Sequence, residues 1–386
     1  MGWDYFVPKP HQNCLQRKVS LNVECDPLTL DPLREHHPQT TLNLLENKLP
    51  HIKITRLANI TGLDDIGIPV WLAIRPSSKY LCVAQGKGLT DTVAKISAVM
   101  ESIELLHLEN IHLPTLLGSY NQLSNTIPCL NPQQINQGFI VAQNIQQQTF
   151  TWLTSTNLIN KQSVWLPREL IAMDMTLPTH VSPYFRQNTT GIAAGNTQNE
   201  ATLKALFEVI ERQTLNLWEK NALPDVSTLD TDIDDPIIQR TLLRITNSGK
   251  QVTLFLLKNP WDTPVYFCEI IDNNMERPVG TCIGSGCHSS HKQAILGAIL
   301  EAVQTRLTLI SGSRDDNYQA FYDNRKNNQP IPCDNYPKHT LTTDMLNDTT
   351  LQNATETTLK NLIQTMHDDN ITQVLLINHT KPELNI

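Results

Sequence analysis

The sequence of 386 residues predicts a mixed α/β (α+β) fold in one large or two modest domains. Short runs of β-branched and aromatic residues alternate with long segments of helical periodicity. A hydrophobic content of 40% against 18% charged residues is ordinary for a chain that buries a substantial core. One short pattern also recurs in three helical segments, which indicates a repeated structural device.

The strand predictions begin with a hairpin. Residues 68–84 (IPVWLAIRPSSKYLCVA) form two strand-like runs joined at Pro76-Ser77-Ser78, and a helix is expected to follow them. Further strands are predicted at 138–143, 251–258, 264–272 and 372–378. Residues 119–138 and 315–343 are rich in Asn, Gln, Pro and Asp, so they are predicted to be loops and candidate internal boundaries.

Composition and charge exclude several kinds of partner. Lys and Arg total 30 against 38 Asp and Glu, a net charge of −8, so a diffuse basic surface for nucleic acid is not expected. The opening MGWDYFVPKPHQNC lacks a signal-peptide pattern, and we find no run of about 18 apolar residues. These features predict a cytoplasmic protein without membrane contact, in which the eight scattered Cys are reduced.

The recurring pattern is Ala, two apolar residues, Glu, any residue, an apolar residue, then Glu or Gln. It occurs as AVMESIE at 98–104, ALFEVIE at 205–211 and AILEAVQ at 298–304. A glycine motif lies about ten to twelve residues before each copy, which predicts a flexible turn ahead of each helix. These motifs are Gly86-Lys87-Gly88, Gly195-Asn196 and Gly284-Ser285-Gly286.

Helical periodicity gathers acidic side chains into stripes. At about 100° per residue, Ser97, Glu101 and Glu104 fall within about 60° of one another. A second stripe spans about 120° if one helix runs through all its members. These are Asn196, Glu200, Glu208 and Glu211. Acids crowded at the edge of a core must take up protons, pair with cations or bind a metal.

Magnesium suits such a cluster, because it prefers hard oxygen ligands and is commonly shared between carboxylates and nucleotide phosphates. Basic residues in or near the motifs could oppose those phosphates. They are Lys87, Arg212, Arg306 and Arg314. For a single helix, the simpler interpretation is a solvated acidic face. Three matching copies favour a shared site.

The same residues resemble the signature of the YcaO family. Its S-x-x-x-E-x-x-E and N-x-x-x-E motifs match Ser97, Glu101, Glu104, Asn196 and Glu200. Its E-x-x-E-R and E-x-x-Q-x-R motifs match Glu208, Glu211, Arg212, Glu301, Gln304 and Arg306, followed by SGSRDD at 311–316. The resemblance covers about residues 50–320. It implies an N-terminal segment at 1–50 and a YcaO-like domain at 51–386, with a motif core at about 54–316.

The resemblance implies that the repeated units converge on one pocket for ATP and Mg²⁺. The implied metal ligands are Glu101, Glu104, Glu200, Glu208, Glu211 and Glu301. The residues implied to hold the nucleotide are Lys87, Ser97, Asn196, Arg212, Gln304, Arg306 and Arg314. The implied reaction is phosphorylation of a peptide backbone amide oxygen, followed by replacement of that oxygen to give a thioamide, azoline or amidine.

The implied subclass is the stand-alone or TfuA-associated type, with a peptide or protein substrate and a TfuA-like or leader-peptide-binding partner. A homodimer is compatible with the sequence. The ending KPELNI lacks the Pro-rich tail typical of azoline-forming members, so the C-terminus reads as short. One alternative is therefore a non-catalytic protein that binds ATP or a peptide. Another is a zinc hydrolase that uses Cys282, Cys287, His288 and His291, although structural zinc sites usually show tighter ligand spacing.

Overall fold

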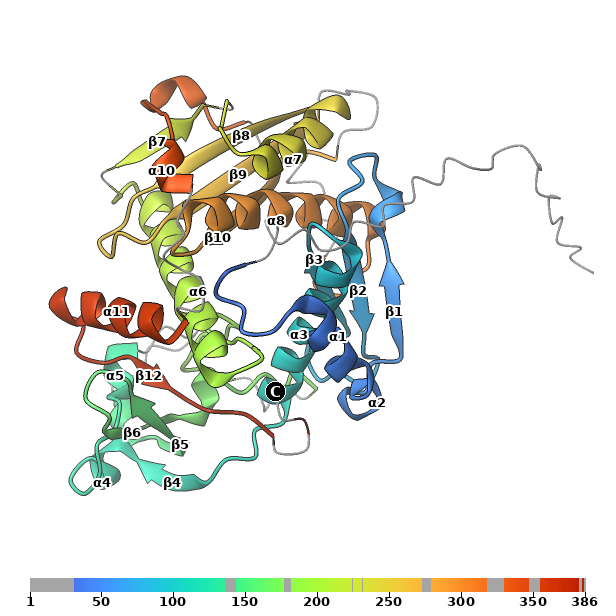
Figure 1. Ribbon diagram of the computed structural model, residues 1–386. Helices are drawn as coiled ribbons and strands as arrows, with labels where there is room; N and C mark the ends of the chain where they lie inside the picture. The colour runs from blue at the N-terminus through green and yellow to red at the C-terminus, as the bar shows by residue number, and fades with distance from the viewer. Residues whose placement is uncertain are drawn as a thin grey trace, which may run out of the picture.

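The computed structural model describes residues 31–135, 144–176, 182–223, 225–230, 232–272, 279–317, 330–346, 355–381 and Leu384. Three sheets and three long helices make up its frame (Figure 1). The mixed α/β prediction is confirmed. The long helices are α3 (Asp91–Glu109), α6 (Gln198–Glu219) and α8 (His291–Ser311).

The first sheet contains the predicted hairpin. Its antiparallel order is β1 (Arg56–Asn59), β2 (Val70–Ile74), β3 (Val83–Lys87). The helix α3 follows, and the Thr90 hydroxyl caps it by accepting a hydrogen bond from the Val93 N–H at 3.3 Å. Helices α1 (Pro38–Glu46) and α2 (Leu49–Ile52) belong to the same unit, with the 3₁₀ turn η2 (Thr61–Leu63). The side chains of Leu45 and Ile52 are buried in one cluster with those of α3.

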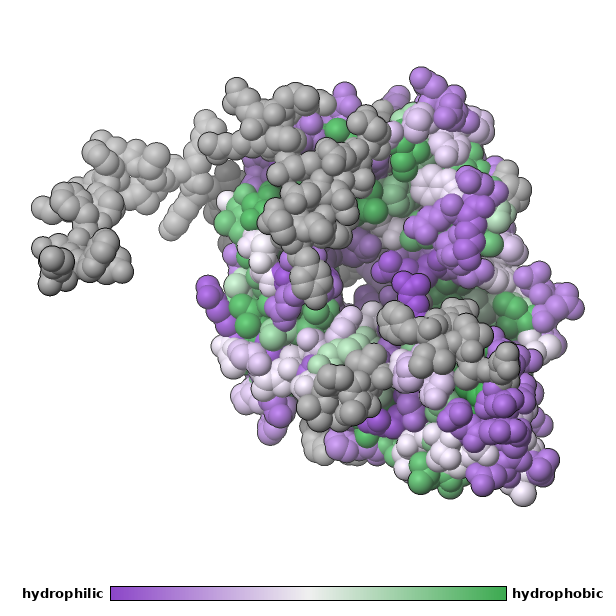
Figure 2. Space-filling model, turned by 180° about the vertical axis from the view of Figure 1, so that it is seen from behind, coloured by the Kyte–Doolittle hydropathy of each residue, from purple (hydrophilic) through white to green (hydrophobic). Residues whose placement is uncertain are grey.

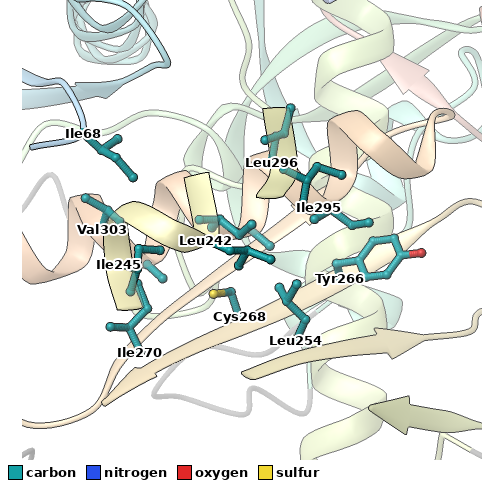
Figure 3. Packing of buried hydrophobic residues seen from close by; sticks show 14 of the residues in the cluster. Ile68, Leu242, Ile245, Leu254, Tyr266, Cys268, Ile270, Ile295, Leu296 and Val303 are labelled. Atoms are coloured by element: carbon teal, nitrogen blue, oxygen red, sulfur yellow. The ribbon is translucent and has the colours of Figure 1, made fainter. Parts of the chain in front are cut away.

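The second sheet has the order β10-β9-β8-β7-β11, antiparallel except where β11 pairs with β7. Its strands are β7 (Val226–Leu229), β8 (Lys250–Leu257), β9 (Val265–Asp272), β10 (Cys282–Cys287) and β11 (Lys338–His339). Helices α7 (Pro236–Asn247) and α8 cover it. Figure 3 shows the apolar core between them, where Leu242 and Ile295 approach Cys268. The strands predicted at 251–258 and 264–272 are thus confirmed.

The third sheet has β12 (Leu375–Leu376) and β4 (Thr115–Ser119) on one side of β5 (Thr149–Asn157), and β6 (Ser163–Pro167) on the other. Four short segments lie beside it, namely α4 (Tyr120–Leu123), α5 (Pro132–Ile135), η3 (Ile145–Gln147) and η4 (Arg168–Leu170). Helix α11 (Thr355–Asp368) packs against α6, and α10 (Thr343–Leu346) and η6 (Cys333–Asn335) complete the described elements.

The glycine motifs are not the flexible turns that the sequence predicted. Gly86 lies in β3, and Gly284 and Gly286 lie in β10. A Cβ on Gly86 would come within 2.0 Å of a main-chain nitrogen of α3, and one on Gly284 within 2.2 Å of a main-chain nitrogen of α8. The glycines are therefore needed because strand and helix backbones pack directly together. Gly195 does lie in the connection before α6.

Other predictions differ in detail. The strand predicted at 138–143 lies outside the described residues, and only Leu375–Leu376 of the segment 372–378 is a strand. The predicted loops contain α4, α5 and β11, while β5 and β6 were not predicted at all. Among the described helices, only α8 is long and apolar enough to cross a membrane by length and composition, but most of it is buried in the core.

Candidate functional site

The three copies of the repeated pattern lie on α3, α6 and α8, which face a common centre (Figure 1). Seen from behind, the molecule is hollowed near its middle, and strongly hydrophilic side chains gather beside the hollow (Figure 2). Helix α3 contributes Glu101 and Glu104 and α8 contributes Glu301, while α6 contributes three acids. Those three are Glu200, Glu208 and Glu211. The second predicted stripe assumed one helix through all four of its members. Its three acids do lie on α6, but Asn196 precedes the helix.

One group of acids surrounds Glu104. Its Oε1 accepts a hydrogen bond from the Ala194 N–H at 2.8 Å and pairs with Lys204 Nζ at 2.9 Å. Burial raises the pKa of Glu101 to about 7, and the negative charge of Glu104 adds to that rise. Burial likewise raises the pKa of Glu208 to about 7, although Arg212 partly opposes the effect. Glu101 and Glu208 therefore lack enough positive charge beside them.

A second group links α6, α8 and β3. Lys87 Nζ pairs with Glu301 Oε2 at 2.6 Å, and the Ser285 hydroxyl donates to Glu211 Oε1 at 2.6 Å. Burial raises the pKa of Glu211 to about 7, and the charge of Glu301 contributes. Burial also disfavours ionisation of Glu301, but the charge and hydrogen bond of Lys87 outweigh it and lower that pKa.

Shared cations connect the two groups. The charge of Lys87 acts on Glu101 as well as on Glu301, and the charge of Arg212 acts on acids of both groups. Because these effects require proximity, the acids of the three helices form one electrostatic site. The site is strongly acidic, and its own Lys and Arg side chains compensate it only in part.

The donor chemistry fits Mg²⁺, since carboxylate oxygens are hard ligands and three of them have pKa values raised to about 7. In the described parts of the chain, however, no three His, Cys, Asp or Glu side chains stand in a ready-made metal geometry. Several of the carboxylates instead hold lysine or arginine partners. A cation entering the site would have to exchange with those partners.

Glu200, which is 4% exposed, is held by Arg34, which the sequence did not indicate, and by Asn196, which it did. Arg34 Nη1 pairs with Glu200 Oε1 at 2.5 Å, and the Asn196 amide donates to Glu200 Oε2 at 2.9 Å. The segment that leads into α1 brings Arg34 to Glu200 of α6 and near enough to Glu104 of α3 for the two charges to interact. Leu33 anchors this segment, since it is buried against α11 and its carbonyl accepts from the Thr355 hydroxyl at 3.0 Å.

The remaining predicted nucleotide residues divide into two groups. Ser97 and Gln304 are half-buried on α3 and α8. The guanidinium of Arg314 pairs with Asp316, and its charge partly offsets the rise in the pKa of Glu101. Arg306 lies in a different cluster. It forms buried ion pairs with Asp64 and Asp272, both at 3.0 Å.

The residues of the zinc alternative do not share a site. Cys282 and Cys287 lie at opposite ends of β10, paired with Ile270 and Val265 of β9. His288 Nε2 contacts Asp31 at 3.2 Å, whereas His291 Nδ1 contacts the Tyr266 hydroxyl at 2.6 Å. Their positions give no common ligand set.

Comparison with known proteins identifies the family. A family model described as YcaO cyclodehydratase, ATP- and Mg²⁺-binding, matches residues 85–386. An uncharacterized protein of Methanothermobacter thermautotrophicus is 29% identical over 318 residues, which is 81% of this chain and 82% of that protein. An uncharacterized protein in the tfuA 3′ region of Rhizobium leguminosarum bv. trifolii is 31% identical over 69% of this chain and 66% of its own length.

The fold agrees with that of a solved relative. The structure of YcaO from Methanopyrus kandleri, bound with AMPPCP and Mg²⁺, superposes with a TM-score of 0.68. The alignment covers 92% of this chain and 88% of that one at 19% sequence identity.

Proposed function

This chain belongs to the YcaO family, and we propose that it uses Mg-ATP to activate a backbone amide of a peptide or protein substrate. ATP and Mg²⁺ are the cofactors of the family. The observation that carries the proposal is the acidic site formed by α3, α6 and α8. Removing three carboxylates partly or wholly from water, so that their pKa rises to about 7, destabilises a protein, and a cation-dependent role therefore explains their presence better than packing does.

The proposed chemistry overcomes the low reactivity of an amide, whose carbonyl is stabilised by resonance. The amide oxygen attacks the γ-phosphorus of ATP, which forms a P–O bond and releases ADP. A nucleophile then adds to the amide carbon, and the original oxygen leaves with phosphate. Magnesium, when bound, neutralises charge on the phosphates. Arg212 and Lys87, which already face the acids, are proposed to bind the phosphates, with Glu101, Glu208, Glu211 and Glu301 as the main metal ligands.

We favour thioamide formation with a TfuA-like partner over cyclisation to an azoline. The support is the similarity to a protein in a tfuA 3′ region. In this version the nucleophile is sulfur from an external source, and the product keeps sulfur where the amide oxygen was. We also propose a cytoplasmic location for the reaction. The alternative is a non-catalytic YcaO-like protein that binds ATP or a peptide for a partner enzyme.

The test is mass spectrometry of the substrate peptide. The protein would be incubated with ATP, Mg²⁺, a sulfide source, candidate precursor peptides encoded near its gene, and each candidate partner. Replacement of oxygen by sulfur supports thioamidation, whereas loss of water supports cyclisation. Arg212→Ala should abolish either change, while Arg240→Ala on the exposed face of α7 should not. An unmodified peptide with a protein that still binds ATP would favour the non-catalytic alternative.

A further inference from the structure

Two cavities of about 320 and 290 Å³ lie beside the N-terminal half of α6, on the side of β12. They share a wall that includes Thr202 and Ala205 of α6 and Leu376 and Ile377 of the C-terminal segment. Because these lining residues are common to both, the cavities adjoin along this wall, and we treat them as one groove. We call it the β12 groove.

The β12 groove ends at the acidic site. The larger cavity is lined by Glu104 and Asn196, which belong to the candidate nucleotide site, and the smaller one extends away from it to Val209 and Leu166. A molecule lying in the groove would therefore have one end beside Glu104.

Few charged groups line the groove among the described residues. The ionisable ones are Glu104 at one end, His107 and His379. Burial lowers the pKa of both histidines, that of His379 to about 4, so each imidazole is neutral near pH 7. The positive charge of Lys381 adds to the lowering of both pKa values, so a cationic side chain away from Glu104 would lose hydration and also be repelled, and the groove suits uncharged groups.

Two features favour a peptide backbone as the occupant. His107 is 5% exposed and its Nδ1 lies 2.7 Å from the Ile103 carbonyl, so Nδ1 carries the proton. Its buried Nε2 is then an acceptor with no partner among the described residues, and a peptide N–H in the groove would satisfy it after a small rotation of the imidazole. Leu376 ends β12, which pairs only with β5 in the described sheet, so the groove also borders a strand edge.

The length of the groove gives the size of the occupant. Its wall on α6 runs from Gln198 to Val209. Eleven residue steps at about 1.5 Å each span about 16 Å. An extended peptide advances about 3.3 Å per residue, so about five residues fit.

We propose that the β12 groove binds about five uncharged residues of the substrate peptide in extended conformation, next to the amide that is activated. This inference rests on the proposed function for the identity of the ligand. Binding in the groove needs no chemistry, however, so it can be measured separately from modification.

The experiment uses the full chain and a synthetic apolar hexapeptide that carries one benzoylphenylalanine, irradiated and mapped by mass spectrometry. Cross-links should fall within 198–209 and 374–380. Ala205→Phe fills the shared wall and should reduce cross-linking about tenfold. Gln213→Phe places the same side chain on an exposed position of α6 outside the groove, and should have no effect.

A second variant covers the case in which Ala205→Phe misfolds. Val209 is 43% exposed at the outer end, so Val209→Lys introduces a charge without disturbing packing and should also reduce cross-linking. A hexapeptide with a central Lys should cross-link about tenfold less than the apolar one. Mg-ATP affinity should stay unchanged in every variant. Cross-links outside the groove, no cross-links, or equal cross-linking in Val209→Lys would overturn the inference, whether or not peptide modification is observed.

Discussion

Replacing Glu211 by Gln should stabilise the protein above neutral pH in the absence of metal and nucleotide. Glu211 is only 9% exposed, and burial with the charge of Glu301 raises its pKa from 4.5 to about 7. Gln keeps the shape of the side chain and the acceptor for the Ser285 hydroxyl, but it carries no charge.

The sign and magnitude follow from proton linkage. Between pH 4.5 and about 7 the folded state holds a proton on Glu211 that the unfolded state has lost, so the free energy of unfolding falls as pH rises. Each pKa unit corresponds to about 1.36 kcal/mol. The wild-type protein loses this free energy over the two units between pH 5 and about 7, whereas the Gln variant does not. The free energy of unfolding of Glu211→Gln relative to wild type should therefore be about 2.7 kcal/mol higher at pH 8.5 than at pH 5.

The assay is urea unfolding of wild type and Glu211→Gln at pH 5 and pH 8.5, in EDTA. Comparing the two proteins at each pH removes the contributions of all other titrating groups. Glu219→Gln is the matched control, because Glu219 is exposed near the end of the same helix and its replacement should change stability by about 0.5 kcal/mol or less. An equal effect of Glu211→Gln at both pH values would refute the reasoning.

Two further predictions concern the frame of the site. Gly284→Ala should destabilise the protein by about 3 kcal/mol or more in urea unfolding, because the added Cβ would overlap the backbone of α8. Gly62→Ala is the control and should be nearly neutral, since nothing lies within 4 Å of the added Cβ. Equal effects of the two substitutions would contradict the proposed packing. Arg75→Ala leaves Glu109 buried without its partner and should cost about 3–5 kcal/mol. Lys360→Ala removes an exposed pair and should cost about 0.5 kcal/mol or less, so similar losses would refute this distinction.

The helices of the site could be predicted because their signal is local. The repeated Ala-apolar-apolar-Glu pattern has helical periodicity, and α3, α6 and α8 each contain one copy. The role of the glycines could not be read in the same way. Glycine favours both turns and close backbone contact, and only the packing of β10 against α8 distinguishes the two uses at Gly284.

The partners of the acids were harder to predict. Arg34 lies 166 residues from Glu200 in sequence, and nothing in its surroundings marks it as a partner. Lys204 reaches Glu104 across two helices that are separated by 100 residues. Such contacts depend on the tertiary arrangement, which a pattern within one segment does not contain.

The most direct test of the central claim is the Mg²⁺ dependence of ATP binding, measured by titration calorimetry. We predict that wild type binds ATP at least about tenfold more weakly in EDTA than in Mg²⁺, because the acidic site repels bare phosphates. Glu208→Gln should weaken the Mg²⁺-dependent binding, since the pKa of Glu208, about 7, marks it as a carboxylate that needs a cation. Equal ATP affinity of the wild-type protein with Mg²⁺ and with EDTA would contradict the account.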